Sequence, residues 1–131
     1  MPTTTTRVVI SSTDLLSSTL SIDATATLTQ AGGSTAINNS TGLATKTLAS
    51  GHAEYKLFEA DDYTDDKAAK LYLKSPSTTA AEYFLIKMGS TQVGRLYAGD
   101  VAIIPWDGTQ DVMIDPSADS MALEYLLFHE G

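Results

Sequence analysis

The sequence predicts an all-β protein, an antiparallel β-sandwich that is jelly-roll-like. Period-two alternation of apolar and polar residues recurs along the chain, turn residues separate short segments, and no helical pattern exceeds two turns. The 131 residues, 43% of them hydrophobic, suffice for one core but not for two. We therefore expect a single sandwich domain over residues 19–131, preceded by a Thr/Ser-rich N-terminal arm or first strand over residues 1–18.

The first 50 residues differ in composition from the rest. They contain 13 Thr and 8 Ser and no aromatic residue, which favours strands over helices. A short β-branched run predicts a strand over residues 7–12. Over residues 19–29, apolar and polar residues alternate strictly, which is the clearest strand pattern of the chain. We interpret this lead segment as peripheral or facing a partner.

Further strands are expected between the turn signals of the remaining chain. Pro105 is expected to end one of them, because proline has no N–H to donate to a neighbouring strand. The expected strands cover residues 43–48, 53–58, 67–74, 82–88, 92–97, 101–104, 111–115 and 121–128.

Charge and composition exclude several classes of function. The net charge is −8, so binding to nucleic acid or to an anionic membrane surface is not expected. No apolar window of roughly 18 residues is present, and the first residues lack the basic and apolar regions of a secretion signal. The absence of cysteine excludes disulfides, thiolate metal sites and cysteine nucleophiles.

An acidic loop over residues 59–66 holds Asp61, Asp62, Asp65 and Asp66. Clustered carboxylates can supply the oxygen ligands of Ca²⁺, but the alternating Asp spacing and distal Glu of an EF-hand are missing. We expect a solvated loop, and cation binding there stays open.

No catalytic constellation is recognisable. Gly99-Asp100 followed by Pro105 matches part of the second cupin motif, but the only histidines are His52 and His129, and they form no His-x-His pair. A Gly-x-Ser-x-Gly nucleophile turn is also missing, and nothing selects two of the 16 acids as a glycosidase pair. The sequence therefore nominates no catalytic, cofactor-binding or metal-ligating residue, and we expect a protein without enzymatic activity or cofactor.

Two aromatic residues suggest a carbohydrate-binding alternative. An exposed Trp106 or Tyr97 ring could stack on a sugar face. Trp106 follows Pro105 at a strand end, however, where a large ring commonly closes the end of a sandwich core. We therefore expect Trp106 to belong to the core and not to a sugar-binding surface.

Several segments resemble small virion structural proteins of tailed bacteriophages, namely head decoration (cement) or fibre-type proteins. The resemblance covers roughly residues 55–130 and transfers no catalytic residue. It implies a small β-domain built into the particle. It is carried by residues 70–75 (KLYLKS), 82–86 (EYFLI), 95–100 (RLYAGD), 103–106 (IIPW) and 123–128 (LEYLLF).

These observations together predict a non-enzymatic capsid decoration protein that binds the shell of the major capsid protein. Its N-terminal segment is expected to reach a neighbour or the major capsid protein, and the protein is expected to be a homotrimer. It would reside in the host cytoplasm before assembly and on the capsid surface of the virion afterwards. The alternatives are a phage tail or fibre adaptor and a carbohydrate-binding β-sandwich module.

Overall fold

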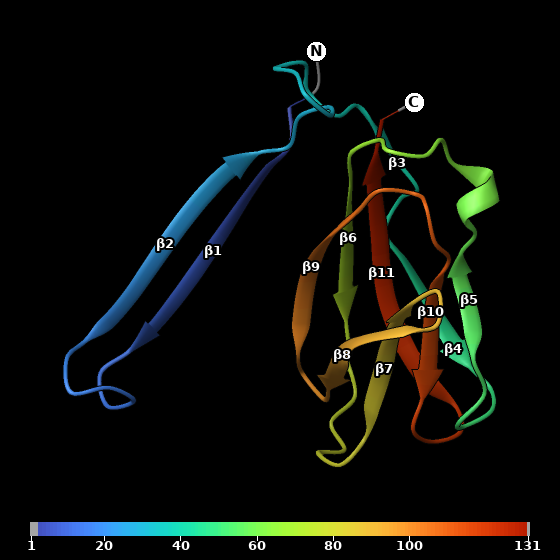
Figure 1. Cartoon of the computed structure of the whole chain (residues 1–131). Coiled ribbons are helices and arrows are strands. Elements are labelled where there is room, and N and C mark those ends of the chain that lie inside the picture. The colour runs from blue at the N-terminus through green and yellow to red at the C-terminus, as the bar shows by residue number, and fades with distance from the viewer. Residues whose placement is uncertain (1–2, 131) are drawn as a thin grey trace.

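The computed structural model describes residues 3–130 and confirms an all-β protein with two antiparallel sheets packed face to face (Figure 1). One short 3-10 helix, η1 (Ala60–Asp62), interrupts the strands. No helix in residues 3–130 has the length and apolar character needed to cross a bilayer.

A two-stranded hairpin projects from the sandwich as an arm (Figure 1). Its strands, β1 (Thr5–Ser12) and β2 (Leu20–Thr27), pair only with each other. The sequence predicted both strands but placed the second within the sandwich domain. The structure differs because alternation shows which side chains share a face, whereas it does not show which strand is the partner. The arm therefore extends to Thr27.

The sandwich consists of a four-stranded and a five-stranded sheet. The first has the order β5-β10-β7-β8, with β5 (Tyr55–Phe58), β10 (Val112–Pro116), β7 (Tyr83–Met88) and β8 (Thr91–Tyr97). The second has β6 (Ala69–Lys74) between β9 (Val101–Trp106) and β11 (Met121–His129). The far edge of β11 pairs with both β3 (Asn39–Ser40) and β4 (Ala44–Leu48).

The eight strands from β4 to β11 form nested antiparallel pairs. β4 pairs with β11, β5 with β10, β6 with β9, and β7 with β8. Successive pairs lie in alternate sheets. The chain is thus arranged as one long antiparallel hairpin that is wrapped around the core.

The core lies between the two sheets and follows from the period-two pattern. In β6, Leu71 and Leu73 are fully buried, whereas Tyr72 and Lys74 turn to the opposite side of the sheet. The same alternation operates in β7, β10 and β11. The buried cluster includes Leu48, Phe58, Leu71, Leu73, Phe84, Ile86, Leu96, Trp106, Val112, Ile114, Leu123 and Leu127.

Pro105 does not end its strand, contrary to the sequence prediction. β9 continues through Pro105, which lies opposite Lys70, to Trp106. β9 is an edge strand of its sheet, and an edge strand has no second neighbour to which an N–H must donate. Proline is therefore tolerated at this position.

Truncation of a central core side chain should destabilise the protein strongly. We expect Leu71→Ala to lower the free energy of unfolding by about 2 to 5 kcal/mol, because the lost methyl groups leave a cavity between the sheets. The measurement is equilibrium denaturation followed by circular dichroism. Val93→Ala is the control, since Val93 is half exposed, and it should change the value by less than about 0.5 kcal/mol.

Candidate functional site

The arm is amphipathic, with an apolar face built by cross-strand pairs. Val8 lies opposite Ala24, and Ile10 lies opposite Ile22, so their side chains share one face. Leu20, which pairs with Ser12, extends this face toward the hairpin loop. Ile10 is 48% exposed and Ile22 is 40% exposed. The arm therefore presents a row of large apolar side chains that remain partly exposed within residues 3–130.

The opposite face of the arm is mainly polar. Arg7 donates two hydrogen bonds to the Asp23 carboxylate, from Nε at 2.9 Å and from an Nη atom at 2.7 Å. The Arg7 guanidinium lowers the pKa of Asp23 below its usual value. Val9, which lies opposite Asp23, is an apolar residue on this side. The two faces thus differ sharply in chemistry.

A second apolar surface lies on the outer side of the five-stranded sheet. Tyr72 of β6 is opposite Ile103 of β9 and Leu126 of β11, so these side chains form one row across three strands. Leu43 and Phe128 join them in lining an open groove. Ile103 is 44% exposed. Contiguous apolar residues on a sheet surface can mark a site of protein–protein contact.

Charged side chains border this row on the same face. Lys74 and Glu124 lie opposite each other, two residues from Tyr72 and Leu126 along their strands. Lys70 lies two residues from Tyr72 in the other direction along β6. The Tyr72 hydroxyl donates to the Glu124 carboxylate at 3.3 Å. Burial, and next the Glu124 charge, raise the pKa of Tyr72, so its hydroxyl keeps its proton at neutral pH. An apolar centre with a polar border is the usual anatomy of a protein interface.

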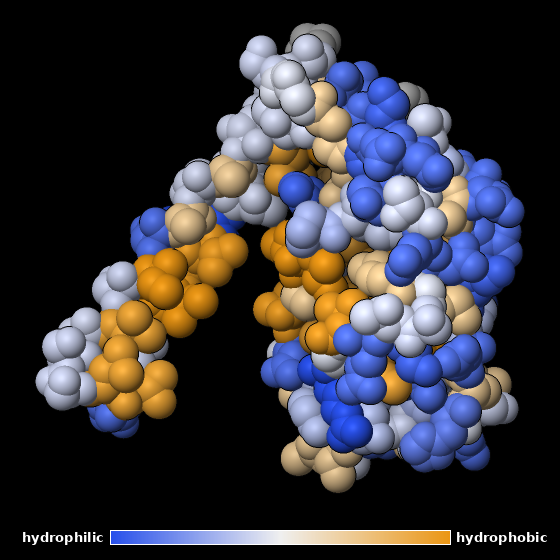
Figure 2. Space-filling view, viewed as in Figure 1, coloured by the Kyte–Doolittle hydropathy of each residue, from blue (hydrophilic) through white to orange (hydrophobic). Residues whose placement is uncertain are grey.

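The two apolar surfaces face one another. Figure 2 shows apolar side chains along the flank of the arm that faces the sandwich, an apolar patch on the facing flank of the sandwich, and open space between them. No strand of the arm pairs with a strand of the sandwich. We define the apolar face of β1 and β2 as the donor face, and the outer apolar row of β9, β6 and β11 as the acceptor face.

Backbone hydrogen bonds and two buried side chains order the root of the arm. Leu28 and Ile37 are almost fully buried, and the Ile37 N–H donates to the Leu28 carbonyl at 3.0 Å. The Leu28 N–H in turn donates to the Thr4 carbonyl at 2.9 Å, which joins the two ends of the hairpin. The arm therefore leaves the sandwich through an ordered connection.

Glu130 ties this root to the end of the sandwich. Its carboxylate accepts hydrogen bonds from the Ala31 N–H at 2.7 Å and the Ala68 N–H at 2.9 Å, and it lies 3.5 Å from the Lys67 ammonium. Its side chain is only 7% exposed. The Ala31 and Ala68 amides lower the pKa of Glu130, with a smaller effect of Lys67.

Protonation or neutralisation of Glu130 should loosen the arm root. Since its pKa is lowered in the folded state, its carboxylate stabilises the fold above the unfolded value of about 4.3, and this contribution is lost as pH falls through the folded pKa. We expect residues 28–38 to lose hydrogen-exchange protection on acidification, and Glu130→Gln to lose it already at pH 7. Exchange is measured by mass spectrometry and corrected for intrinsic rates. Glu124→Gln, on the same terminal segment, should leave this protection unchanged.

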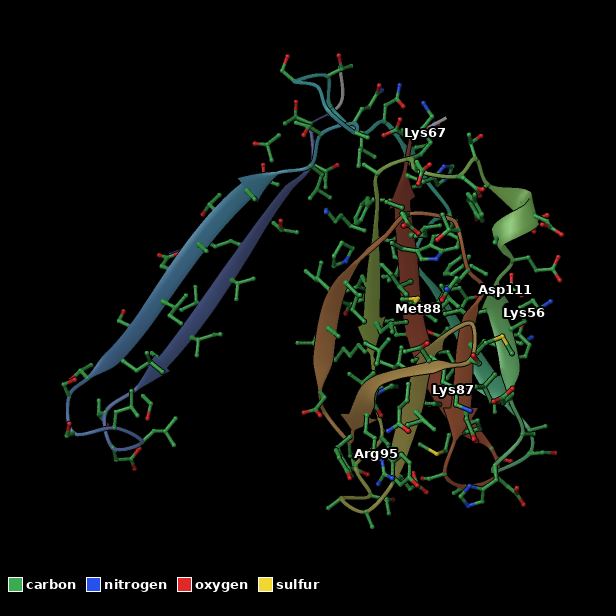
Figure 3. All side chains as sticks on the ribbon, viewed as in Figure 1. Lys56, Lys67, Lys87, Met88, Arg95 and Asp111 are labelled. Atoms are coloured by element: carbon green, nitrogen blue, oxygen red, sulfur yellow. The ribbon has the colours of Figure 1, made fainter. Side chains whose placement is uncertain are left out.

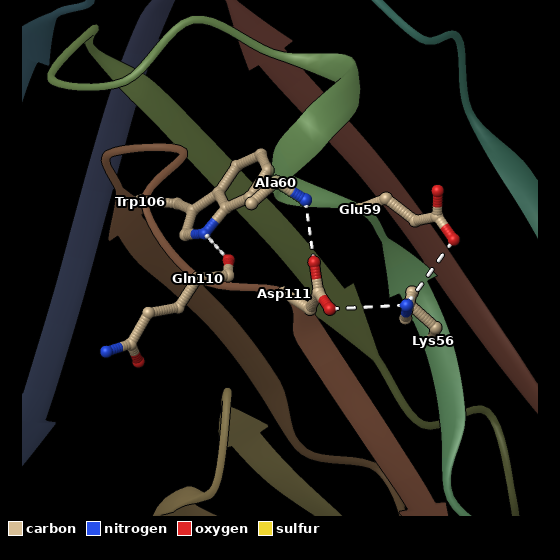
Figure 4. A network of polar contacts seen from close by, with 6 residues as sticks. All are labelled: Lys56, Glu59, Ala60, Trp106, Gln110 and Asp111. Carbon is tan, nitrogen blue, oxygen red and sulfur yellow. Dashed lines mark hydrogen bonds and ion pairs between the residues drawn. The ribbon is translucent and has the colours of Figure 1, made fainter.

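Trp106 and Tyr97 do not form a common sugar-binding surface. Trp106 is 6% exposed, packs against Phe58 and Tyr63 with ring centroids 6.1 and 5.2 Å away, and donates from Nε1 to the Gln110 carbonyl at 2.8 Å (Figure 4). Its ring closes the end of the core. This buried position agrees with the core interpretation that the sequence favoured.

Tyr97 lies at the other end of the sandwich. Trp106 is opposite Ala69 at the start of β6, whereas Gly99 donates to the Ser75 carbonyl just after β6 ends. Figure 3 shows these two ends, with Lys67 near the arm root and Arg95 of β8 far from it. The exposed Tyr97 ring packs against Tyr83.

The acidic loop is held at its base and exposed at its carboxylates. Asp111 accepts a hydrogen bond from the Ala60 N–H at 2.8 Å and pairs with Lys56 at 3.3 Å, while Lys56 also lies 3.4 Å from Glu59 (Figure 4). The Ala60 amide first, and then Lys56, lower the pKa of Asp111. The four loop carboxylates that the sequence singled out, Asp61, Asp62, Asp65 and Asp66, are all exposed. Within residues 3–130, no three His, Asp or Glu side chains are arranged to hold a metal ion.

The two histidines lie far apart along the fold. His52 donates from its backbone N–H to the Pro116 carbonyl at 2.6 Å, beside the turn that precedes β11. His129 lies at the opposite end of β11, where its ring packs edge-on against Tyr63. The fold therefore does not bring them together into one site.

Comparisons of the chain with models of protein families, with curated proteins and with solved structures found no match. The candidate functional site consists of the two apolar faces, the donor face of the arm and the acceptor face of the sandwich. The sequence predicted a peripheral lead segment but did not predict the acceptor face. The sequence nevertheless indicates this face, because residues 101–104 and 125–128 are apolar at every position and so place apolar side chains on both sides of the sheet.

Proposed function

We propose that this protein is a non-enzymatic capsid decoration (cement) protein of a tailed bacteriophage, which binds the shell of the major capsid protein on the virion surface. The observation that carries the proposal is the amphipathic arm, which extends beyond a packed sandwich and presents apolar side chains to a partner. Self-association as a homotrimer forms part of the proposal.

The strand order supports this proposal. Four nested pairs that alternate between two sheets are what results when a long hairpin is rolled up, and we interpret the sandwich as a jelly roll. This architecture is common in capsid and lectin domains. Architecture alone does not define function, so the proposal rests on the arm together with the resemblance of residues 55–130 to small virion proteins.

Charge and surface chemistry also suit the proposed role. The net charge of −8 keeps free copies soluble in the host cytoplasm before assembly. Repeated copies on a shell can then add many modest contacts to a strong total attachment.

The proposal predicts a high copy number in the particle. Quantitative mass spectrometry of purified virions should find this protein at an abundance comparable with that of the major capsid protein. A decoration protein occupies repeated positions on the shell, which is the reason for this expectation. A few tens of copies or fewer per particle would contradict it and would favour a tail or fibre adaptor instead.

A further inference from the structure

We propose that copies of this chain exchange arms, so that the donor face of one copy packs onto the acceptor face of a second copy. This inference rests on the self-association included in the proposed function, but not on attachment to a capsid. It assigns a specific surface to each side of the contact.

The arm requires a second apolar surface against its own apolar face in order to be stable. A two-stranded hairpin alone is at best marginally stable in water. In this arm Val8, Ile10 and Ile22 are each at least 40% exposed, and they all lie on one face. Burial of that face against another apolar surface supplies the free energy that the hairpin alone lacks.

The acceptor face is apolar like the donor face, and the sheet that carries it is wide enough for a two-stranded ribbon. Each arm strand has eight residues and spans about 27 Å, with two strands about 5 Å apart. The sheet surface that carries the acceptor face spans three strands and at least six residues along each, or about 20 Å by 14 Å. A two-stranded ribbon therefore fits over the row formed by Ile103, Tyr72 and Leu126.

The net charge differs between the arm and the sandwich. Residues 1–50 contain two acidic and two basic residues, so the net charge of −8 resides in the rest of the chain. Two sandwiches therefore repel each other, whereas the arm is nearly neutral. The acceptor face also carries Lys70 and Lys74 at its border. The arm is thus the part of a second copy that approaches this face at the lowest electrostatic cost.

The arm of a second copy can reach the acceptor face more easily than the arm of the same chain can. The root is fixed by Glu130 and by the buried Leu28 and Ile37, and it holds the arm away from the sandwich of the same chain (Figures 1 and 2). Folding back would require this ordered connection to bend, whereas an arm from a second copy reaches the open face without such a change.

Donor and acceptor are different surfaces, so each copy offers one of each. Contacts of this heterologous kind cover every surface only when the copies form a closed ring. The expected homotrimer satisfies this condition, with each arm on the sandwich of the next copy.

The first test is the mass of the purified full chain in solution, measured by light scattering. We expect the wild type to be oligomeric, and Ile10→Lys on the donor face and Ile103→Lys on the acceptor face each to reduce the mass to that of one chain. Val9→Lys, on the other face of β1, and Val93→Lys, on the exposed part of β8, are matched controls that should stay oligomeric. All four residues are exposed, and circular dichroism verifies that each variant folds.

The outcomes separate the two proposals. A wild-type oligomer that both Ile10→Lys and Ile103→Lys leave intact would overturn arm exchange while self-association stands. A monomeric wild type would overturn arm exchange and the homotrimer together. Attachment to the capsid is then judged separately, by the copy number in virions.

The second test distinguishes exchange from folding back. Because the chain has no cysteine, the double variant Ile10→Cys/Ile103→Cys carries the only two thiols. A short bismaleimide should join chains to one another, visible on a denaturing gel as species of two or more chains. Cross-linking within single chains would overturn the inference. Val9→Cys/Ile103→Cys, with one thiol on the polar face of the arm, should cross-link at least tenfold less.

Discussion

The packing of the two sheets against each other is the constraint on which the rest of the molecule depends. Leu71 and Leu73 of β6 are fully buried, and strand geometry then forces the residue between them, Tyr72, to the outer side. The same rule turns Ile103 and Leu126 outward. The sandwich core is complete without these side chains, so core packing does not explain their apolar character, whereas the arm exchange proposed above does.

Glu130 connects the root of the arm to the sandwich. Glu130 is charged, nearly buried and shared between the arm root and the start of β6. A charge in such a position is retained only when hydrogen bonds satisfy it, and here two backbone amides do so. These two bonds attach the arm root to the segment that leads into β6.

The sequence was informative about strands and less so about partners. Alternation identified the strand at residues 19–29, yet pairing with β1 depends on a hairpin loop whose geometry the pattern does not encode. Pro105 illustrates the same limit, because its effect depends on whether β9 is an edge strand. Trp106 was interpreted correctly from its place at a strand end. The acceptor face was missed because apolar residues at outward positions resemble those of a strand buried on both sides.

The nested pairing also sets the order in which the chain can fold. β7 and β8 are adjacent in sequence, and so are β1 and β2, so these hairpins close with little loss of chain entropy. β4 and β11 enclose the six strands from β5 to β10, and their pairing must follow. The outer surface of the five-stranded sheet needs β11, whereas the arm is formed by the earliest strands. A nascent chain therefore contains both arm strands well before its sheet surface exists.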